Sequence, residues 1–201
     1  MIKRRLGHLR VAAAAAALIA ACAPAVSRNR ASDPLPPGFD ARTVEIHYQW
    51  RGMPGSPQVS RKVRLQRQGD TYTSTGTSEL ALRSMEGGRI AGPLAVTVPD
   101  SAMRAFLRAL AAAPRRRGRY VPFFSHTDDY PETTITLRSD AGAVVEFYNS
   151  SQATHPWRVT VGGQRYVCDT AAPFEAERHL LPFVHYQELN RAVEGQRQAK
   201  P

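Results

Sequence analysis

The chain has 201 residues, with 27 lysines and arginines against 17 aspartates and glutamates, which gives a formal net charge of +10 at pH 7. Its longest apolar run covers residues 11–21, and no later segment approaches the same length. A helix needs about 20 apolar residues to span a bilayer. No segment of the sequence is therefore long enough to cross a membrane as a helix.

The first 21 residues have the pattern of a secretory signal peptide. Four basic residues and no acidic residue precede the apolar run, and small residues end it. We therefore expect export, and at that address we expect no nucleic-acid partner. Without this leader 23 basic and 17 acidic residues remain, a net charge of +6. That excess favours an anionic partner, such as lipid phosphates or the acidic groups of an envelope polymer, although a solvated basic surface without a specific partner explains it equally well.

The end of the leader, Ile19-Ala20-Ala21-Cys22, resembles the lipobox of bacterial lipoproteins. In that family an aliphatic residue and two small residues precede a cysteine that is acylated and becomes the first residue of the mature chain. The resemblance implies that Cys22 carries a lipid anchor. Ala23, in place of aspartate, implies the outer membrane, with the protein facing the periplasm. A looser cleavage pattern, Ala-Cys-Ala, would instead discard Cys22 with the leader.

The mature chain divides by composition into three parts. Residues 22–40 are rich in proline and poor in large apolar side chains, which predicts a semi-extended tether. At about 3 Å per residue this tether could hold a domain up to ~50 Å from the membrane. Residues 41–190 are enough for one domain, and residues 191–201 form a polar tail.

The first half of the domain shows strands followed by a helix. Apolar and polar residues alternate over 44–51, and two further strands over 61–68 and 71–77 flank a Gly-Asp turn. The hairpin formed by these two strands is polar on both faces, so we expect it at a sheet edge or protruding. A helix begins at Asp100 or Ser101 as its cap and ends before Pro114. Its apolar face is predicted from the spacing i, i+3, i+4, i+7 of Met103, Phe106, Leu107 and Leu110.

The second half contains two hairpins whose registers can be predicted. A three-residue loop at 140–142 pairs Leu137 with Val145, and a Gly-Gly turn at 162–163 pairs Trp157 with Cys168. Cys168 is then an inward-facing small hydrophobe, so we expect no disulfide with Cys22. A terminal helix follows, capped by Thr170 and with Phe174, Leu180 and Leu181 as its apolar contacts.

These elements predict an α+β single domain, in which an antiparallel β-sheet built from hairpins packs against two helices. The β-rich, threonine-rich second half loosely resembles small uncharacterised bacterial lipoprotein domains. That resemblance implies no particular function.

The loop at 125–130 is the main candidate for chemistry. His126, Asp128 and Asp129 place one imidazole and two carboxylates within four residues, which suits a metal ligand set or a general base with its orienting partner. The spacing matches no metal signature, and the same residues are ordinary turn formers. We therefore assign no metal, no cofactor and no catalytic residue, and keep the loop as a candidate ligand or metal site.

Basic residues follow the first helix and recur on a later strand. Arg115, Arg116, Arg117 and Arg119 are a candidate anion patch that contacts lipid headgroups, and equally a wet helix end where cations meet the macrodipole. Arg158 and Arg165, with Thr160, face away from the predicted core. If their strands neighbour the strand at 44–51, they form an arginine-bearing sheet face suited to an acidic or sugar ligand.

The sequence lacks the Gly-x-Ser-x-Gly, Walker, dinucleotide and His-Glu-x-x-His motifs. We therefore expect a lipid-anchored binding or assembly module for an anionic envelope component or a protein partner, rather than an enzyme. The alternatives are a metal-dependent or acid/base hydrolase centred on His126, Asp128 and Asp129, and a purely structural envelope protein. The oligomeric state stays open.

Overall fold

The computed structural model describes residues 35–184 except 37, 51–57, 75–78, 84–88, 94, 124–130 and 152. The predicted leader, the lipidation site Cys22 and most of the tether lie outside the described residues. Leu35, which the sequence assigns to the tether, is buried in the core, so the folded region begins earlier in the chain than expected.

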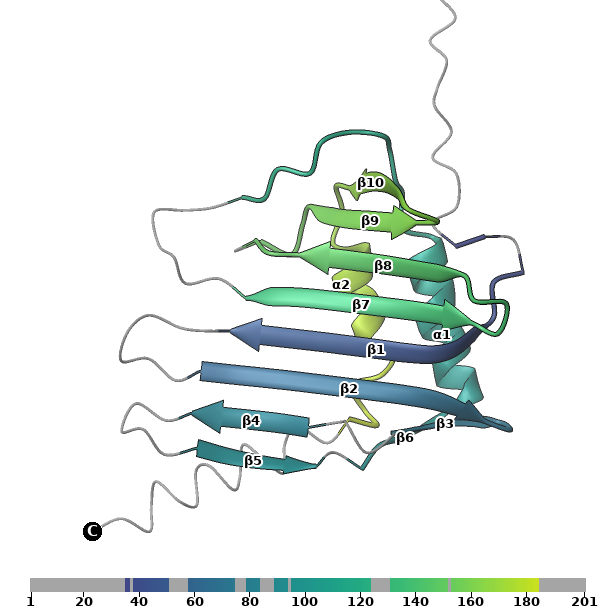
Figure 1. Cartoon of the computed structure of the whole chain (residues 1–201), viewed down its shortest axis with the longest axis vertical. Helices are drawn as coiled ribbons and strands as arrows, with labels where there is room; N and C mark the ends of the chain where they lie inside the picture. The colour runs from purple at the N-terminus through teal and green to yellow at the C-terminus, as the bar shows by residue number, and fades with distance from the viewer. Residues whose placement is uncertain are drawn as a thin grey trace, which may run out of the picture. The chain divides into compact units, whose positions relative to one another are not determined.

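The described residues contain ten strands, and all of them belong to one antiparallel sheet (Figure 1). Their order is β10-β9-β8-β7-β1-β2-β3-β6, with β4 paired to β2 and β5 paired to β4. The strands are β1 Ala41–Trp50, β2 Gln58–Gln68, β3 Thr71–Ser74, β4 Glu79–Arg83, β5 Arg89–Pro93, β6 Thr97–Pro99, β7 Glu132–Ser139, β8 Val144–Asn149, β9 Trp157–Val161 and β10 Gln164–Cys168.

Strand β1 lies near the middle of the sheet, between β2 and β7. The long strand β2 pairs with β1 along one side, while its other side is shared by β4 and β3. Two helices complete the described part of the domain, α1 Asp100–Ala111 and α2 Ala172–Glu177. The class is therefore α+β, with much more sheet than helix.

Both predicted hairpin registers are confirmed. Leu137 pairs with Val145 across β7 and β8, and Trp157 pairs with Cys168 across β9 and β10. The second hairpin turns at Gly162 and Gly163, whose φ angles are 56° and 80°. A two-residue hairpin turn with positive φ at both positions favours glycine, so the Gly-Gly pair fixes the register.

One sheet face carries the core. Alternate residues of the central strands are buried, including Val44 and Ile46 on β1, and they form one cluster with buried residues of both helices. Met103, Phe106 and Leu110 of α1 are fully buried at i, i+3 and i+7, as the helical spacing predicts. Figure 1 shows both helices on the same side of the sheet. The other face of the sheet carries the polar alternate residues.

Three local predictions are wrong. The hairpin of β2 and β3 is not at the sheet edge, because β6 pairs with β3 and the buried Tyr72 hydroxyl donates to the carbonyl of Ala41. Asp100 does not cap α1: the cap is Pro99, without a side-chain hydrogen bond, and Asp100 pairs with Arg104 instead.

The third wrong prediction concerns the terminal helix. Phe174 and Leu181, expected as core contacts, are exposed, while Leu180 is buried as predicted. The helix is short, and Thr170 accepts a hydrogen bond from the amide of Ala172 at 3.4 Å just before it. Because α2 ends at Glu177, Leu181 lies beyond the helix in the turns that follow it, and the helical spacing that would place Phe174 and Leu181 on one face is not continued.

Candidate functional site: an arginine–tyrosine pocket at the sheet edge

The loop with His126, Asp128 and Asp129 lies outside the described residues. Its candidate chemistry therefore stays a sequence prediction. In the part of the chain that the structure describes, no group of three histidine, cysteine or acidic side chains could hold a metal ion.

The arginine run after α1 does not form one exposed patch. The guanidinium of Arg115 is buried and lies 4.6 Å from the centroid of the Tyr166 ring. Arg116 donates from Nε to a carboxylate oxygen of Asp169 at 2.5 Å. Only Arg117 and Arg119 are exposed without such a contact. The run therefore combines two side chains that attach it to the domain with two that face solvent.

Backbone hydrogen bonds explain how this segment is placed. The amide of Arg116 donates to the carbonyl of Val167, and the amide of Val167 donates to the carbonyl of Arg116, both at 2.9 Å. The segment after α1 thus runs along the outer edge of β10, as Figure 1 shows. This pairing brings residues 118–120 beside the last hairpin of the sheet.

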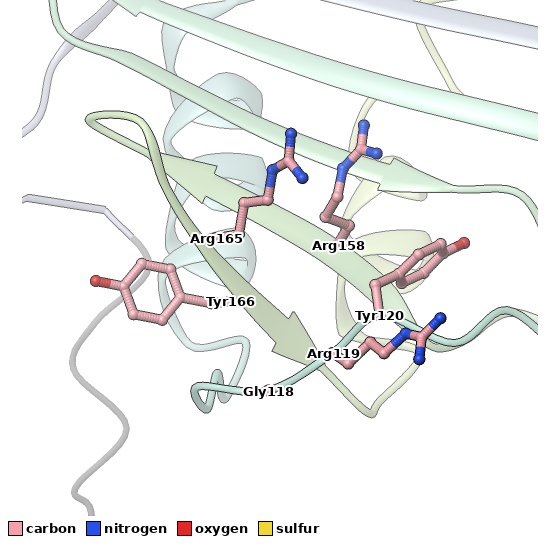
Figure 2. A pocket seen from close by; sticks show the side chains of 6 residues that line it. All are labelled: Gly118, Arg119, Tyr120, Arg158, Arg165 and Tyr166. Carbon is pink, nitrogen blue, oxygen red and sulfur yellow. The ribbon is translucent and has the colours of Figure 1, made fainter.

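A pocket of about 330 Å³ lies where this segment meets β9 and β10. Its lining consists of Gly118, Arg119, Tyr120, Arg158, Arg165 and Tyr166 (Figure 2). Three arginines from three different chain segments therefore contribute to one small cavity. Among the described residues, the lining contains no histidine, cysteine or carboxylate.

The strand pattern determines how two of these arginines point. Trp157 and Val159 of β9 are buried in the core, so Arg158 between them faces the opposite side of the sheet. Arg165 of β10 pairs with Thr160, which has the same orientation as Arg158. Figure 2 shows the guanidinium groups of Arg158 and Arg165 on the same side of the hairpin.

Positive charge exceeds negative charge at the pocket. Arg158 donates to Glu146 at 3.3 Å, and its guanidinium lies 4.3 Å from the centroid of the Tyr148 ring. Among the described residues, neither Arg119 nor Arg165 has an ion-pair partner. Within the part of the chain that the structure describes, one of the three pocket arginines is thus partly neutralised by a carboxylate and the other two are not.

The tyrosines are held in place by their own contacts. The hydroxyl of Tyr120 accepts a hydrogen bond from the amide of Ser150 at 2.8 Å, and its ring meets Tyr148 edge to face with centroids 6.1 Å apart. The hydroxyl of Tyr166 donates to the side-chain oxygen of Gln164 at 2.6 Å. The pocket walls are therefore ordered before any ligand arrives, which reduces the entropy lost on binding.

This arrangement suits binding of an acidic group. A guanidinium is planar, always charged, and matches phosphate and carboxylate with two parallel hydrogen bonds. The lining residue types offer neither a nucleophile with an activating base nor a metal ligand set.

Sequence patterns indicated part of this site. They predicted the outward orientation of Arg158 and Arg165 and included Arg119 in an anion patch. They missed Tyr120 and Tyr166, for which the sequence has no local signal. The condition for one continuous arginine-bearing face with β1 is not met, because β7 and β8 lie between β1 and β9.

A second arginine contact lies on the opposite, core-facing side of the sheet. Arg61 of β2 donates to Glu177 of α2 at 2.7 Å, and both side chains are largely buried. Burial raises the pKa of Glu177, while the charge of Arg61 and its hydrogen bond act in the opposite direction. This pair connects the sheet to α2 and is separate from the pocket.

Comparison with known protein families, with curated proteins and with solved structures finds no match to this chain. Over the described residues, the structure contains no helix that is long and apolar enough to traverse a bilayer.

Proposed function

We propose that the protein is a lipid-anchored lipoprotein of the outer membrane, whose periplasmic domain binds an anionic component of the envelope. The sheet packs one face against α1 and α2 and leaves its other face for a ligand. The observation that carries the proposal is the pocket with Arg119, Arg158 and Arg165, which has one partly neutralising carboxylate, Glu146. The ligand group is a phosphate or a carboxylate.

The address is supported by the leader and by Ile19-Ala20-Ala21-Cys22, which match a lipoprotein signal. Mass spectrometry of the mature N-terminus tests it. We expect an acylated Cys22 as the first residue. An unmodified chain that starts at Pro24 would contradict the anchor, and it would leave the anion-binding proposal to its own test.

Calorimetric titration of the purified protein tests the binding proposal with two probes, glycerol phosphate and a galacturonate oligomer. The phosphate probe represents a lipid headgroup and the carboxylate probe an acidic polymer, so the stronger binder identifies the source of the anion. We expect measurable affinity for at least one of them, and weaker affinity at higher salt because exposed charges are screened.

The matched variants are Arg119→Gln/Arg165→Gln in the pocket and Arg42→Gln outside it. Arg42 is exposed and pairs with Asp140, so its substitution changes the net charge without touching the lining. We expect the double variant to bind about 10-fold more weakly, because it loses two surface charge contacts that are each worth about 0.7 kcal/mol. Equal affinity in the double variant, or an equal loss in Arg42→Gln, would overturn the proposal.

A further inference from the structure

The segment that leads from the pocket displays two large apolar side chains to solvent. Val121 is 63% exposed and Phe123 is 61% exposed, more than any other large apolar residue that the structure describes. Isolated exposed apolar residues are ordinary, but two such residues next to unpaired basic residues define a surface of a particular kind. Arg117 and Arg119 precede them in the same segment and are also exposed.

Over residues 119–123, exposed residues alternate with half-buried ones. Tyr120 and Pro122 are half-buried, and Arg119, Val121 and Phe123 between and beside them are exposed. This alternation is typical of an extended chain that turns every second side chain toward solvent. Arg117 and Gly118, which precede this stretch in a bend, are both exposed. We call residues 117–123 the docking segment.

The backbone of the docking segment is held against the domain. Ser151, which is buried, accepts a hydrogen bond from the amide of Phe123 at 3.2 Å, and its hydroxyl lies 3.0 Å from the carbonyl of Phe123. Tyr120, in the middle of the segment, is held by a hydrogen bond from the amide of Ser150 to its hydroxyl. The exposure of Phe123 therefore results from an ordered backbone that directs the side chain outward.

We propose that the docking segment lies on the surface of an anionic bilayer, with Val121 and Phe123 in the boundary between headgroups and acyl chains and with Arg117 and Arg119 at the lipid phosphates. Aromatic and aliphatic side chains beside basic ones are the composition of protein surfaces that lie in this interface. Each basic residue near an anionic leaflet is attracted by the surface potential. This inference rests on the proposed function and names its anionic partner.

The charge of the segment favours a bilayer over another occupant. Neither Arg117 nor Arg119 has an ion-pair partner among the described residues, so both charges are available to lipid phosphates. The other exposed apolar pair, Phe174 and Leu181, differs in this respect, because Arg178 between them pairs with Glu175 at 2.8 Å. The lipid anchor expected at Cys22 would also keep the domain within reach of the membrane, so that a weak contact suffices.

Site-specific fluorescence tests the docking. Phe123→Cys and the matched control Phe174→Cys are labelled in the mature full-length chain with a polarity-sensitive nitrobenzoxadiazole dye. Cys168 is buried, and labelling of the parent chain reports any free thiol at Cys22. Each labelled protein is added to vesicles of phosphatidylcholine alone and of phosphatidylcholine mixed with phosphatidylglycerol.

We expect a blue shift of the dye at position 123 on the anionic vesicles, quenching by spin-labelled lipid there, and no shift at position 174. Replacement of Arg117 and Arg119 by glutamine abolishes the shift. A water-like spectrum at position 123 on anionic vesicles overturns the proposal. A shift that needs no vesicles and grows with protein concentration also overturns it, because it assigns the segment to a second copy of the chain.

Failure of the docking can be distinguished from failure of the proposed function. Flotation with the phosphatidylcholine vesicles detects membrane attachment through the lipid anchor, and titration with glycerol phosphate detects anion binding by the pocket. Either can succeed while position 123 stays in water. In that case the proposed membrane contact of the docking segment is wrong, and the proposed anion-binding function is unaffected.

Discussion

Each face of the sheet carries a cluster of one arginine, one glutamate and one tyrosine, and the two clusters differ in their surroundings. On the core-facing side, Arg61 pairs with Glu177 and lies 5.4 Å from the centroid of the Tyr48 ring, its neighbour across β1 and β2. On the other side, Arg158 pairs with Glu146 and lies 4.3 Å from the centroid of the Tyr148 ring. Tyr148 is its neighbour across β8 and β9.

Burial separates the two clusters. The side chains of Arg61 and Glu177 are 14% and 12% exposed, whereas those of Arg158 and Glu146 are 32% and 37% exposed. A buried charge needs its partner, because removal of either leaves the other without compensation. A half-exposed pair contributes little to stability, so its arginine can exchange a carboxylate for a ligand. The same three residue types therefore form a structural connection on one face and, in the function proposed above, a binding group on the other.

The largest expected effect is on the buried cluster. Arg61→Met removes the partner of Glu177, and we expect the free energy of unfolding to fall by about 3 kcal/mol at pH 7, as for other broken buried pairs. Urea denaturation measures it. The double variant Arg61→Met/Glu177→Leu removes both charges and recovers most of the loss. A double variant as unstable as the single one would show that the pair is not the cause.

This loss depends on pH in a direction that the pKa of Glu177 determines. Burial already raises that pKa above its ordinary value of 4.5, and without Arg61 it rises further. A carboxyl group with a raised folded-state pKa adds stability below its unfolded-state pKa, and the contribution disappears as the pH increases through the folded-state pKa. Arg61→Met is therefore closer to the parent chain at pH 4 than at pH 7. A deficit that grows toward pH 4 would contradict this assignment.

A smaller effect is expected where a buried hydroxyl holds the pocket-bearing segment. Ser151→Ala removes the hydrogen bonds to Phe123, and we expect a loss of about 1 kcal/mol in the free energy of unfolding. Amide hydrogen exchange at Phe123 should accelerate, while exchange in the β7–β8 hairpin stays unchanged. Ser139→Ala, at a half-buried hydroxyl in that hairpin, is the matched control and should leave exchange at Phe123 as it is.

The smallest expected effect comes from substitution of the carboxylate in the half-exposed cluster. Glu146→Gln removes the carboxylate that competes for Arg158, so we expect anion affinity to increase about threefold, for a half-exposed pair worth ~0.6 kcal/mol. Stability should stay within about 0.5 kcal/mol of the parent chain. Titration with glycerol phosphate measures the first and urea denaturation the second. Weaker anion binding in this variant would mean that Glu146 positions Arg158 rather than competes for it.

The sequence predicted those parts of the fold that short-range patterns determine. Gly162 and Gly163 fix a hairpin because the turn itself needs positive φ, and alternation then assigns Trp157 to the core and Arg158 to the other face. The hydrophobic spacing of Met103, Phe106 and Leu110 likewise predicted the buried face of α1. In each case the residues that decide the structure lie within about ten positions of one another.

The parts that the sequence did not predict depend on contacts between distant residues. Arg61 and Glu177 are 116 positions apart, and no local pattern indicates that they meet. The pairing of Arg116 with Val167 turns an expected helix-end patch into an edge segment, and it helps to bring Tyr120 and Arg119 to the pocket. Local propensity cannot report which distant strand offers an open edge.

Nitrogen-15 NMR of the arginine side chains tests the central claim most directly, because it observes both clusters in one titration. With glycerol phosphate as the probe, the Nε–H signals of Arg119, Arg158 and Arg165 should shift together with a single affinity, and the signal of Arg61 should stay in place. Signals of the three pocket arginines that do not move, or that move no more than those of Arg42 and Arg61, would contradict the account.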